Sequence, residues 1–345
     1  MPLAPVRLGL IGAGRIGTSH ARVIAERVPG AVLAAVADAR PGAAATLAGR
    51  YGAAAYDQPQ SLIDDPGVDA VVITASSTAH AELIIAVAGA GKPVFCEKPA
   101  SMTLDEMDRV LAAVDAAGVT LQVGFNRRFD AGFAAAHAAV SAGSIGQVQL
   151  MRSLTRDPGL ADPGAVPPWT IFTQTLIHDF DALLWLHPGA EPVEVYATAD
   201  ALVAPAFKDA GLLDTAVVVL TFDNGARAVA EASFSAAYGY DVRAEVFGSQ
   251  GMVTVGDGAR SSARFSTSGG RQHDTARGDV ELMGEAYADE LREFVAAIRE
   301  DRQPSVTGHD ARRALAVALA CVESVQAHAP VAVAEAQATL QPVTA

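Results

Sequence analysis

The chain has 345 residues, of which half are hydrophobic and 19% are charged. This length favours two domains, and the balance of apolar and charged residues excludes a disordered protein. The formal net charge of −14 argues against nucleic acid and anionic membrane surfaces as partners, because both are negatively charged themselves.

The two cysteines, Cys96 and Cys321, are far apart and form neither a disulfide framework nor a metal-binding spacing. We therefore expect no metal site and a reducing compartment. The first 17 residues lack the sections of a signal peptide, and no apolar run reaches membrane-spanning length. Together these patterns predict a cytoplasmic protein that uses no membrane.

The first 40 residues follow the order of a dinucleotide-binding unit. An apolar run over 6–11 predicts a buried strand, which leads into Gly12-Ala13-Gly14-Arg15-Ile16-Gly17 and a helix over 18–27. A second strand over 31–37 ends at Asp38. A glycine motif alone is weak evidence, but the strand, helix and acid around it make this one specific.

Each glycine of the motif has its own task in binding a dinucleotide. Gly12 permits the tight turn, Gly14 lets the backbone approach the pyrophosphate, and Gly17 lets the helix pack on the strand. Asp38 can accept hydrogen bonds from a ribose 2′-hydroxyl and would repel a 2′-phosphate, which favours NAD over NADP. Arg40 argues the other way, because an arginine there can pair with a 2′-phosphate.

Strands and helices continue to alternate through residue 124, which predicts a parallel sheet with helices on both faces. The elements expected are helices over 42–51, 79–90 and 104–117, and strands over 68–75, 94–97 and 120–124. We expect residues 1–125 to form a doubly wound Rossmann domain. Its expected cofactor contacts are Gly12, Gly14, Arg15, Ile16, Gly17, Asp38, Arg40, Ser76, Glu97 and Lys98.

Glu97-Lys98-Pro99 follows one of these strands at its carboxyl end. In open α/β sheets, ligands bind beyond the carboxyl ends of the strands. Lys98 can orient and polarise a hydroxyl there, while Pro99 restricts the turn. Without the motifs that follow it in the sequence, a surface lysine in a turn would be the better interpretation of this tripeptide.

A different pattern follows residue 125. A helix over 133–141 and a strand over 148–156 lead to a loop rich in Pro and Gly over 157–169, which is typical of a lid, a binding loop or a plain surface excursion. The segment 172–185 has helical periodicity, and four residues separate Gln174 from His178 on one face. Taken alone, a histidine on an apolar helix is more often structural than catalytic.

From residue 193 onward strands dominate, over 193–198, 215–222, 226–234, 241–248 and 251–255. They predict a large, mostly antiparallel open sheet, with helix 172–186 on one face. A mobile loop is expected over 260–275, followed by helices near 285–300 and 311–327. We expect residues 126–345 to form an α+β domain for substrate binding and oligomerisation, whose C-terminal helices can pack back on the first domain.

With these motifs in order, the whole chain resembles the glucose–fructose oxidoreductase, inositol dehydrogenase and rhizopine-catabolism family. The matching residues are the glycine motif at 12–17, Glu97-Lys98-Pro99 and His178-Asp179-Phe180-Asp181. Within that family, the segments 124–130, 156–158 and 238–241 look like inositol 2-dehydrogenases.

The resemblance implies a Rossmann domain, an α+β domain whose sheet mediates dimers or tetramers, and a catalytic lysine and histidine at Lys98 and His178. Gln174 stands where the family usually has an aspartate, and a glutamine cannot stabilise an imidazolium by charge. Residues 169–171 replace paired glycines. The substrate contacts expected are Lys98, Arg127, Arg156, Asp157, Trp169, Gln174, His178, Tyr238 and Tyr240.

The function expected is NAD-dependent oxidation of a secondary hydroxyl of a polyol, with inositol as the leading substrate. His178 would take the hydroxyl proton, Lys98 would hydrogen-bond the same oxygen, and Gln174 would orient the substrate or His178. Three alternatives stay open: a dehydrogenase of a sugar or glycoside, an NAD-dependent glycosidase, and a non-catalytic NAD or sugar sensor.

Overall fold

The computed structural model describes residues 4–335, apart from residues 160, 161, 163, 165, 210, 211 and 262. Four residues of the expected Pro/Gly-rich loop (160, 161, 163 and 165) therefore lie outside the described residues. The chain forms two compact units: unit 1 is Met1–Phe129 with Glu285–Arg312, and unit 2 is Asp130–Gly284 with Arg313–Ala345. The domain boundary predicted between residues 125 and 126 stays a prediction.

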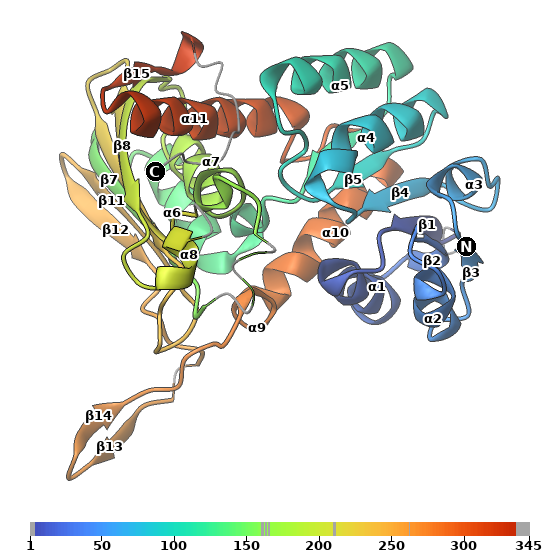
Figure 1. The fold of residues 1–345 in the computed structure, drawn as a ribbon, viewed down its shortest axis with the longest axis horizontal. Helices are drawn as coiled ribbons and strands as arrows, with labels where there is room; N and C mark the ends of the chain where they lie inside the picture. The colour runs from blue at the N-terminus through green and yellow to red at the C-terminus, as the bar shows by residue number, and fades with distance from the viewer. Residues whose placement is uncertain are drawn as a thin grey trace. The chain divides into compact units, whose positions relative to one another are not determined.

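Unit 1 is built on a six-stranded parallel sheet of order β3-β2-β1-β4-β5-β6 (Figure 1). Its strands are β1 (Val6–Ile11), β2 (Ala31–Ala37), β3 (Ala54–Tyr56), β4 (Ala70–Ile73), β5 (Val94–Cys96) and β6 (Leu121–Val123). The direction of winding reverses between β1 and β4, where ligands bind in doubly wound sheets. This order confirms the predicted Rossmann fold.

The helices of unit 1 include one that comes from the far end of the chain. They are α1 (Arg15–Arg27), α2 (Ala43–Gly49), α3 (Pro59–Ile63), α4 (His80–Gly89), α5 (Leu104–Ala117) and α10 (Gly284–Glu300), with short 3-10 turns η1 (Ser77–Ala79) and η2 (Asn126–Phe129). Leu291 and Phe294 of α10 are fully buried in the same core as Leu8 of β1. The core of unit 1 is therefore completed by residues almost 300 positions downstream.

Unit 2 is built on a seven-stranded sheet of order β12-β11-β7-β10-β9-β8-β15. Its strands are β7 (Val148–Arg156), β8 (Pro192–Asp200), β9 (Thr215–Phe222), β10 (Arg227–Ser233), β11 (Asp241–Gly248), β12 (Gly251–Val255) and β15 (Val331–Ala332). The pair β7–β10 is parallel and the other pairs are antiparallel. The predicted mostly antiparallel sheet is confirmed.

The two faces of this sheet differ. Ser153 and Thr155 of β7 point to the face that packs against α7, whose Asp179 accepts hydrogen bonds from both hydroxyls. The opposite face exposes apolar side chains such as Leu150 and Phe247.

The helical segments of unit 2 are α6 (Ala131–Ser141), the π-helix η4 (Ile171–Leu176), α7 (Ile177–Trp185), α8 (Pro205–Asp209), α9 (Asp279–Leu282), η5 (Val333–Glu335) and α11 (Gly308–Ala327), which begins in unit 1.

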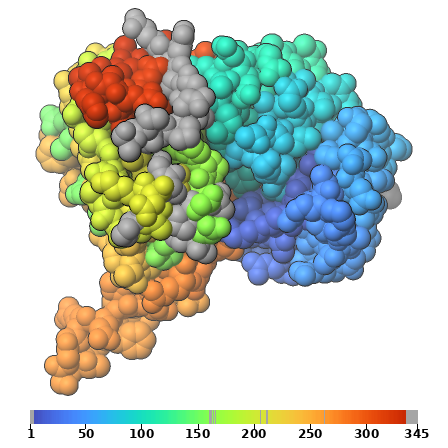
Figure 2. Space-filling view, viewed as in Figure 1, coloured from blue at the N-terminus to red at the C-terminus, as the bar shows by residue number. Residues whose placement is uncertain are grey.

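The expected loop over 260–275 contains two paired strands, β13 (Phe265–Thr267) and β14 (Gly270–Gln272). The sequence analysis did not predict this strand pair, and the mobility of the segment stays a prediction. The residues of both strands are exposed, so no hydrophobic alternation marked them in the sequence. Figure 2 shows this hairpin, in orange, standing away from the rest of unit 2. Among the described residues, no helix has the length and apolarity needed to cross a membrane.

Candidate active site

The three glycines of the motif between β1 and α1 are in three different environments. Gly12 has a φ of 104°, and a Cβ there would lie 2.6 Å from backbone atoms of Thr74 and Ala75. A Cβ on Gly17 would lie 1.8 Å from the carbonyl oxygen of Gly12. A Cβ on Gly14 would meet no atom within 4 Å. The chain's own packing therefore requires Gly12 and Gly17, whereas Gly14 borders open space that a bound dinucleotide can occupy.

This contrast predicts different outcomes for two matched substitutions. We expect Gly17→Ala to lower the free energy of unfolding by about 3 kcal/mol or more, because its Cβ overlaps backbone that cannot move aside cheaply. We expect Gly14→Ala to leave the unfolding midpoint unchanged and to weaken NAD binding at least about tenfold. Denaturant unfolding and calorimetric titration with NAD check both. A stable Gly17→Ala protein would contradict the packing argument.

The acid at the end of β2 lies beside the glycine turn. Asp38 accepts a hydrogen bond from the Ala13 amide at 2.7 Å, and the Arg40 guanidinium donates to both its oxygens at 3.0 and 2.9 Å. The hydrogen bonds from Arg40 and the backbone amides lower the pKa of Asp38 to about 2, so the carboxylate is ionised at neutral pH. A surface depression of about 480 Å³ adjoins this pair, lined by Ala13, Thr18, Arg40, Pro41, Gly42, Ala43, Thr46, Leu47 and Arg50. The sequence analysis missed Thr18, Thr46 and Arg50, which carry no motif of their own.

The remaining candidates of unit 1 gather at one edge of its sheet. Ser76 follows β4, Lys98 follows β5 and Arg127 follows β6, and parallel strands place their carboxyl ends together. Arg127 is 2% exposed. The Lys98–Pro99 peptide bond is cis. Arg15 and Ile16 open α1 at the same edge. Apart from Glu97, the unit 1 residues predicted to form a site therefore lie along the edge where ligands bind in such sheets.

Glu97 lies behind this edge, and its carboxylate does not face the solvent. It is 7% exposed and accepts a hydrogen bond from Nε2 of His20 at 2.6 Å. Gly124 leaves room for it, because a Cβ there would lie 3.1 Å from Glu97 Oε2. The sequence analysis did not anticipate the partnership of Glu97 with His20, which are 77 residues apart.

In unit 2, Gln174 and His178 share one face of a helix that begins as a π-helix. Both side chains are half-buried, whereas the other residues from 171 to 180 are buried. A π-helical turn inside an α-helix often occurs at functional sites. The predicted helix over 172–185 is confirmed in place, but its first turns are π-helical and not α-helical.

Trp169 precedes this helix in an unusual conformation. Its φ is 63°, a left-handed value that bulky side chains rarely adopt, and its indole is buried. Its carbonyl oxygen accepts hydrogen bonds from the amides of Phe172 and Thr173. The backbone here has the conformation that a glycine adopts without strain. Strain of this kind is typical of binding sites.

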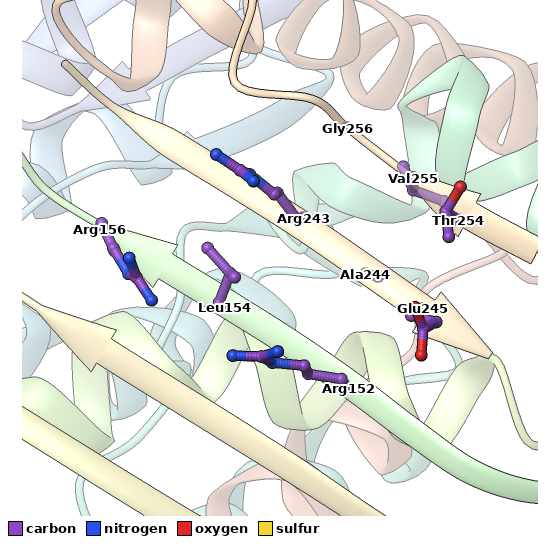
Figure 3. Close-up of a pocket in the computed structure, with 9 residues that line it drawn as sticks. All are labelled: Arg152, Leu154, Arg156, Arg243, Ala244, Glu245, Thr254, Val255 and Gly256. Carbon is purple, nitrogen blue, oxygen red and sulfur yellow. The ribbon is translucent and has the colours of Figure 1, made fainter. Parts of the chain in front are cut away.

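Arg156 faces away from this helix. Its guanidinium pairs with Glu231 at 2.6 Å, on the sheet face opposite to Ser153 and Thr155. Figure 3 shows it with Arg152 and Leu154 of β7. These line a cavity of about 250 Å³ together with Arg243, Ala244, Glu245, Thr254, Val255 and Gly256. The structure thus does not bring Arg156 to the face on which α7 packs, and its role in substrate binding stays a prediction.

The other candidates of unit 2 lie near the ends of β7 and β11. The Asp157 amide donates to the carbonyl oxygen of Ser233, and the hydroxyl of Tyr238 donates to Asp241 at 2.8 Å. Tyr238 is 45% exposed, whereas Tyr240 is buried. Their contacts with a substrate also stay predictions.

Comparison with known proteins agrees with this fold and with the glycine turn. Residues 6–125 match the oxidoreductase family with an NAD-binding Rossmann fold, and residues 133–254 match the GFO/IDH/MocA C-terminal domain. The chain is 39% identical to a myo-inositol 2-dehydrogenase of Thermotoga maritima, over 93% of this chain and 96% of that protein. It is 35% identical to a scyllo-inositol 2-dehydrogenase (NAD(+)) of Bacillus subtilis, over 94% and 96% respectively.

A solved structure supports the same relationship. The scyllo-inositol dehydrogenase of Lactobacillus casei, crystallised with bound NAD(H) and scyllo-inositol, superposes with a TM-score of 0.92 at 26% identity. The superposition covers 96% of this chain and all of the other. The chain is therefore an NAD-binding oxidoreductase and belongs to the Gfo/Idh/MocA family.

Proposed function

We propose that the protein oxidises one secondary hydroxyl of a cyclic polyol to a ketone with NAD, and that inositol is its substrate. The observation that carries the proposal is the similarity to inositol 2-dehydrogenases along nearly the whole chain. Relatives that act on myo- and scyllo-inositol resemble the chain to a similar degree, so the proposal names the substrate class and not the isomer.

The residues of unit 1 fit the cofactor. Gly14 borders open space at the N-terminus of α1, where backbone amides and the helix dipole attract a pyrophosphate. Asp38 presents an ionised carboxylate for a ribose 2′-hydroxyl. Bound there, NAD supplies the acceptor for a hydride. Arg40 is engaged with Asp38, which leaves it less available for the 2′-phosphate of NADP.

Three residues of the chain carry the remaining chemistry. His178 accepts the proton of the reacting hydroxyl as a general base. The Lys98 ammonium donates a hydrogen bond to the same oxygen and stabilises the negative charge that develops on it. Gln174, four residues before His178 on the same helical face, orients the substrate or the imidazole through its amide without adding charge.

The test is NADH formation measured with myo-, scyllo- and chiro-inositol, glucose, xylose and several glycosides. Turnover of at least one inositol with NAD is the expected result. Turnover of only a sugar or a glycoside would keep the chemistry and replace the substrate. Cleavage of a nitrophenyl glycoside without NADH accumulation would identify a glycosidase. No turnover of any compound, with NAD still bound, would favour a sensor.

The preference for NAD is tested at Asp38. We expect Asp38→Ala to weaken NAD binding about tenfold to a hundredfold, because a charge-assisted hydrogen bond contributes about 1.5–3 kcal/mol. The same change releases Arg40 for a 2′-phosphate, so NADP should bind better than it does to the wild type. Titration with both cofactors measures the ratio. An unchanged ratio would exclude Asp38 as the selecting residue.

We also propose that the protein forms a homodimer or homotetramer through the open face of the seven-stranded sheet. That face exposes Leu150, Tyr196, Val217, Val219 and Phe247. An apolar surface of this kind is typical of an interface. Light scattering of the wild type and of a Val217→Lys, Val219→Lys double variant tests the proposal, and an unchanged mass would contradict it.

A further inference from the structure

A cluster of three ionisable side chains is buried in unit 1, behind the strand end that carries Lys98. His20 comes from α1, Glu97 follows β5 and Glu290 comes from α10, and they are 1%, 7% and 0% exposed. One nitrogen or oxygen of each lies within 4.8 Å of those of the other two. Three groups that can carry charge therefore share a space closed to water, which is costly unless their charges are balanced.

Aromatic rings close this space on the side of His20. Its ring makes edge-to-face contacts with Phe95, at a centroid distance of 5.6 Å, and with Tyr287, at 5.7 Å. Phe95 in turn contacts Phe294 of α10 at 5.9 Å. The low dielectric of such surroundings penalises any unbalanced charge.

The cluster has more acceptors than donors. Both carboxyl oxygens of Glu290 are buried with no hydrogen-bond partner among the described residues, and the same holds for Oε1 of Gln122. Gln122 lies beside Glu290, since its Nε2 donates to the Glu290 carbonyl oxygen at 2.7 Å. The one donor in the cluster is Nε2 of His20, which is bound to Glu97. A proton or a metal ion on Glu290 would correct this imbalance.

The geometry favours a proton over a metal ion. Two ligands that bind zinc at about 2.0–2.1 Å in a tetrahedral site lie roughly 3.3 Å apart. The His20 Nε2 to Glu97 Oε1 distance is 2.6 Å, which is a hydrogen bond. A metal-bound histidine also donates its second nitrogen to an acceptor, whereas Nδ1 of His20 has no partner in the described part of the chain.

We propose that Glu290 is a neutral carboxylic acid in the folded protein, and that His20, Glu97 and Glu290 form a buried proton-binding cluster that positions the strand end carrying Lys98. His20 donates to Glu97, while the Glu290 proton is available to Glu97 or to Gln122. Burial, and then the negative charge of Glu97, raise the pKa of Glu290 well above its ordinary value. Only the effect on Lys98 rests on the proposed dehydrogenase function.

Infrared spectroscopy of the full-length protein with isotopically labelled glutamate tests the proton directly. The expected result at neutral pH is a carboxylic acid carbonyl band that is absent in Glu290→Gln. Glu293→Gln is the matched control, because Glu293 lies on the same helix with its carboxylate on Arg302 and an ordinary ionised state. The band should persist in that variant. No band in the wild type would overturn the proposal, as would one bound metal ion per chain that Glu290→Gln loses.

Stability gives a second readout. A glutamate with a raised pKa in the folded state holds a proton that the unfolded state releases, so folding is favoured most below the ordinary glutamate pKa and less as the pH rises. From about pH 5 up to the raised pKa of Glu290 in the folded protein, the unfolding equilibrium constant of the wild type should rise about tenfold per pH unit relative to Glu290→Gln. Parallel pH profiles of the two proteins would contradict the proposal.

The positioning role needs a readout that a purely structural residue would not change. Ionisation of Glu290 at high pH places two carboxylates together behind Lys98, so kcat/KM for the alcohol should fall on the alkaline side in the wild type. In Glu290→Gln this fall should move to higher pH. If the infrared band is present but the two pH–rate profiles coincide, the proton site stands and the positioning role is wrong. If no substrate is turned over, the infrared and stability results still decide the proton site.

Discussion

Replacing His178 with alanine should lower kcat about a hundredfold to ten-thousandfold, because general-base catalysis of a proton transfer contributes that much. Replacing Lys98 with alanine should cost at least about a hundredfold, because it removes a cation from an oxygen that becomes negative in the transition state. The measurement is steady-state NADH formation with the best substrate of the panel. NAD affinity, measured by titration, should remain within a few-fold of the wild type for His178→Ala.

Conservative variants separate chemistry from structure at these positions. His178→Gln retains a hydrogen-bonding side chain but accepts no proton, so its turnover should be as low as that of His178→Ala. Lys98→Arg keeps the positive charge but carries it on a planar guanidinium group, so it should recover part of the rate that Lys98→Ala loses. Near wild-type turnover in both alanine variants would rule out the assigned mechanism while leaving the fold and the cofactor site intact.

Loss of Asp179 should have the largest effect on stability. This carboxylate is 0% exposed and accepts hydrogen bonds from Ser153 at 2.5 Å and Thr155 at 2.7 Å. Asp179→Ala leaves both hydroxyls buried without their acceptor, and each such group costs about 1–3 kcal/mol. We therefore expect the free energy of unfolding to fall by about 3–5 kcal/mol. Urea unfolding followed by circular dichroism measures it.

Two control variants test whether the lost hydrogen bonds cause this effect. Asp179→Asn keeps the shape and one acceptor oxygen, so it should lose clearly less stability than the alanine variant. Glu194→Ala removes an exposed acid from β8 of the same unit and should change stability by no more than about 0.5 kcal/mol. A loss under about 1 kcal/mol for Asp179→Ala would show that solvent or a neighbouring acceptor replaces the carboxylate.

Regular hydrophobic patterns predicted the larger elements well. The bounds expected for 148–156, 215–222, 241–248 and 251–255 coincide with β7, β9, β11 and β12, since each has buried and exposed residues in alternation or a clear turn at its end. Short elements gave no such signal. Ala54–Tyr56 forms an edge strand of three residues, and α3 spans only five, so neither is long enough to repeat its pattern twice.

The conformation of single residues lies beyond what a pattern can predict. Helical periodicity anticipated the segment around His178, but it does not distinguish a π-helical from an α-helical first turn, because both place Gln174 near His178. Nothing in the sequence marks Trp169 as left-handed, since that residue type disfavours the conformation. The orientation of Arg156, by contrast, could have been predicted from the sequence. Successive side chains of a strand point to opposite faces, so Arg156 cannot share a face with residues 153 and 155.

Contacts between distant parts of the chain were the hardest feature to predict from the sequence. His20 and Glu290 are brought together only by the packing of α10 on the Rossmann sheet, and no spacing rule connects residues 270 positions apart. Glu97 was predicted to contact the cofactor. The structure shows that its carboxylate accepts a hydrogen bond from a buried histidine, and its contact with the cofactor stays a prediction.

The return of α10 to unit 1 also affects how the protein is made. A ribosome that has completed residue 129 has synthesised every strand of the Rossmann sheet but not Leu291 or Phe294, which complete its core. At about 5–20 residues per second, synthesis of the intervening 155 residues (130–284) takes roughly 8–30 s. During that interval the nascent sheet exposes the apolar surface that α10 later covers, so the unit that is begun first is completed only after most of the other has been synthesised.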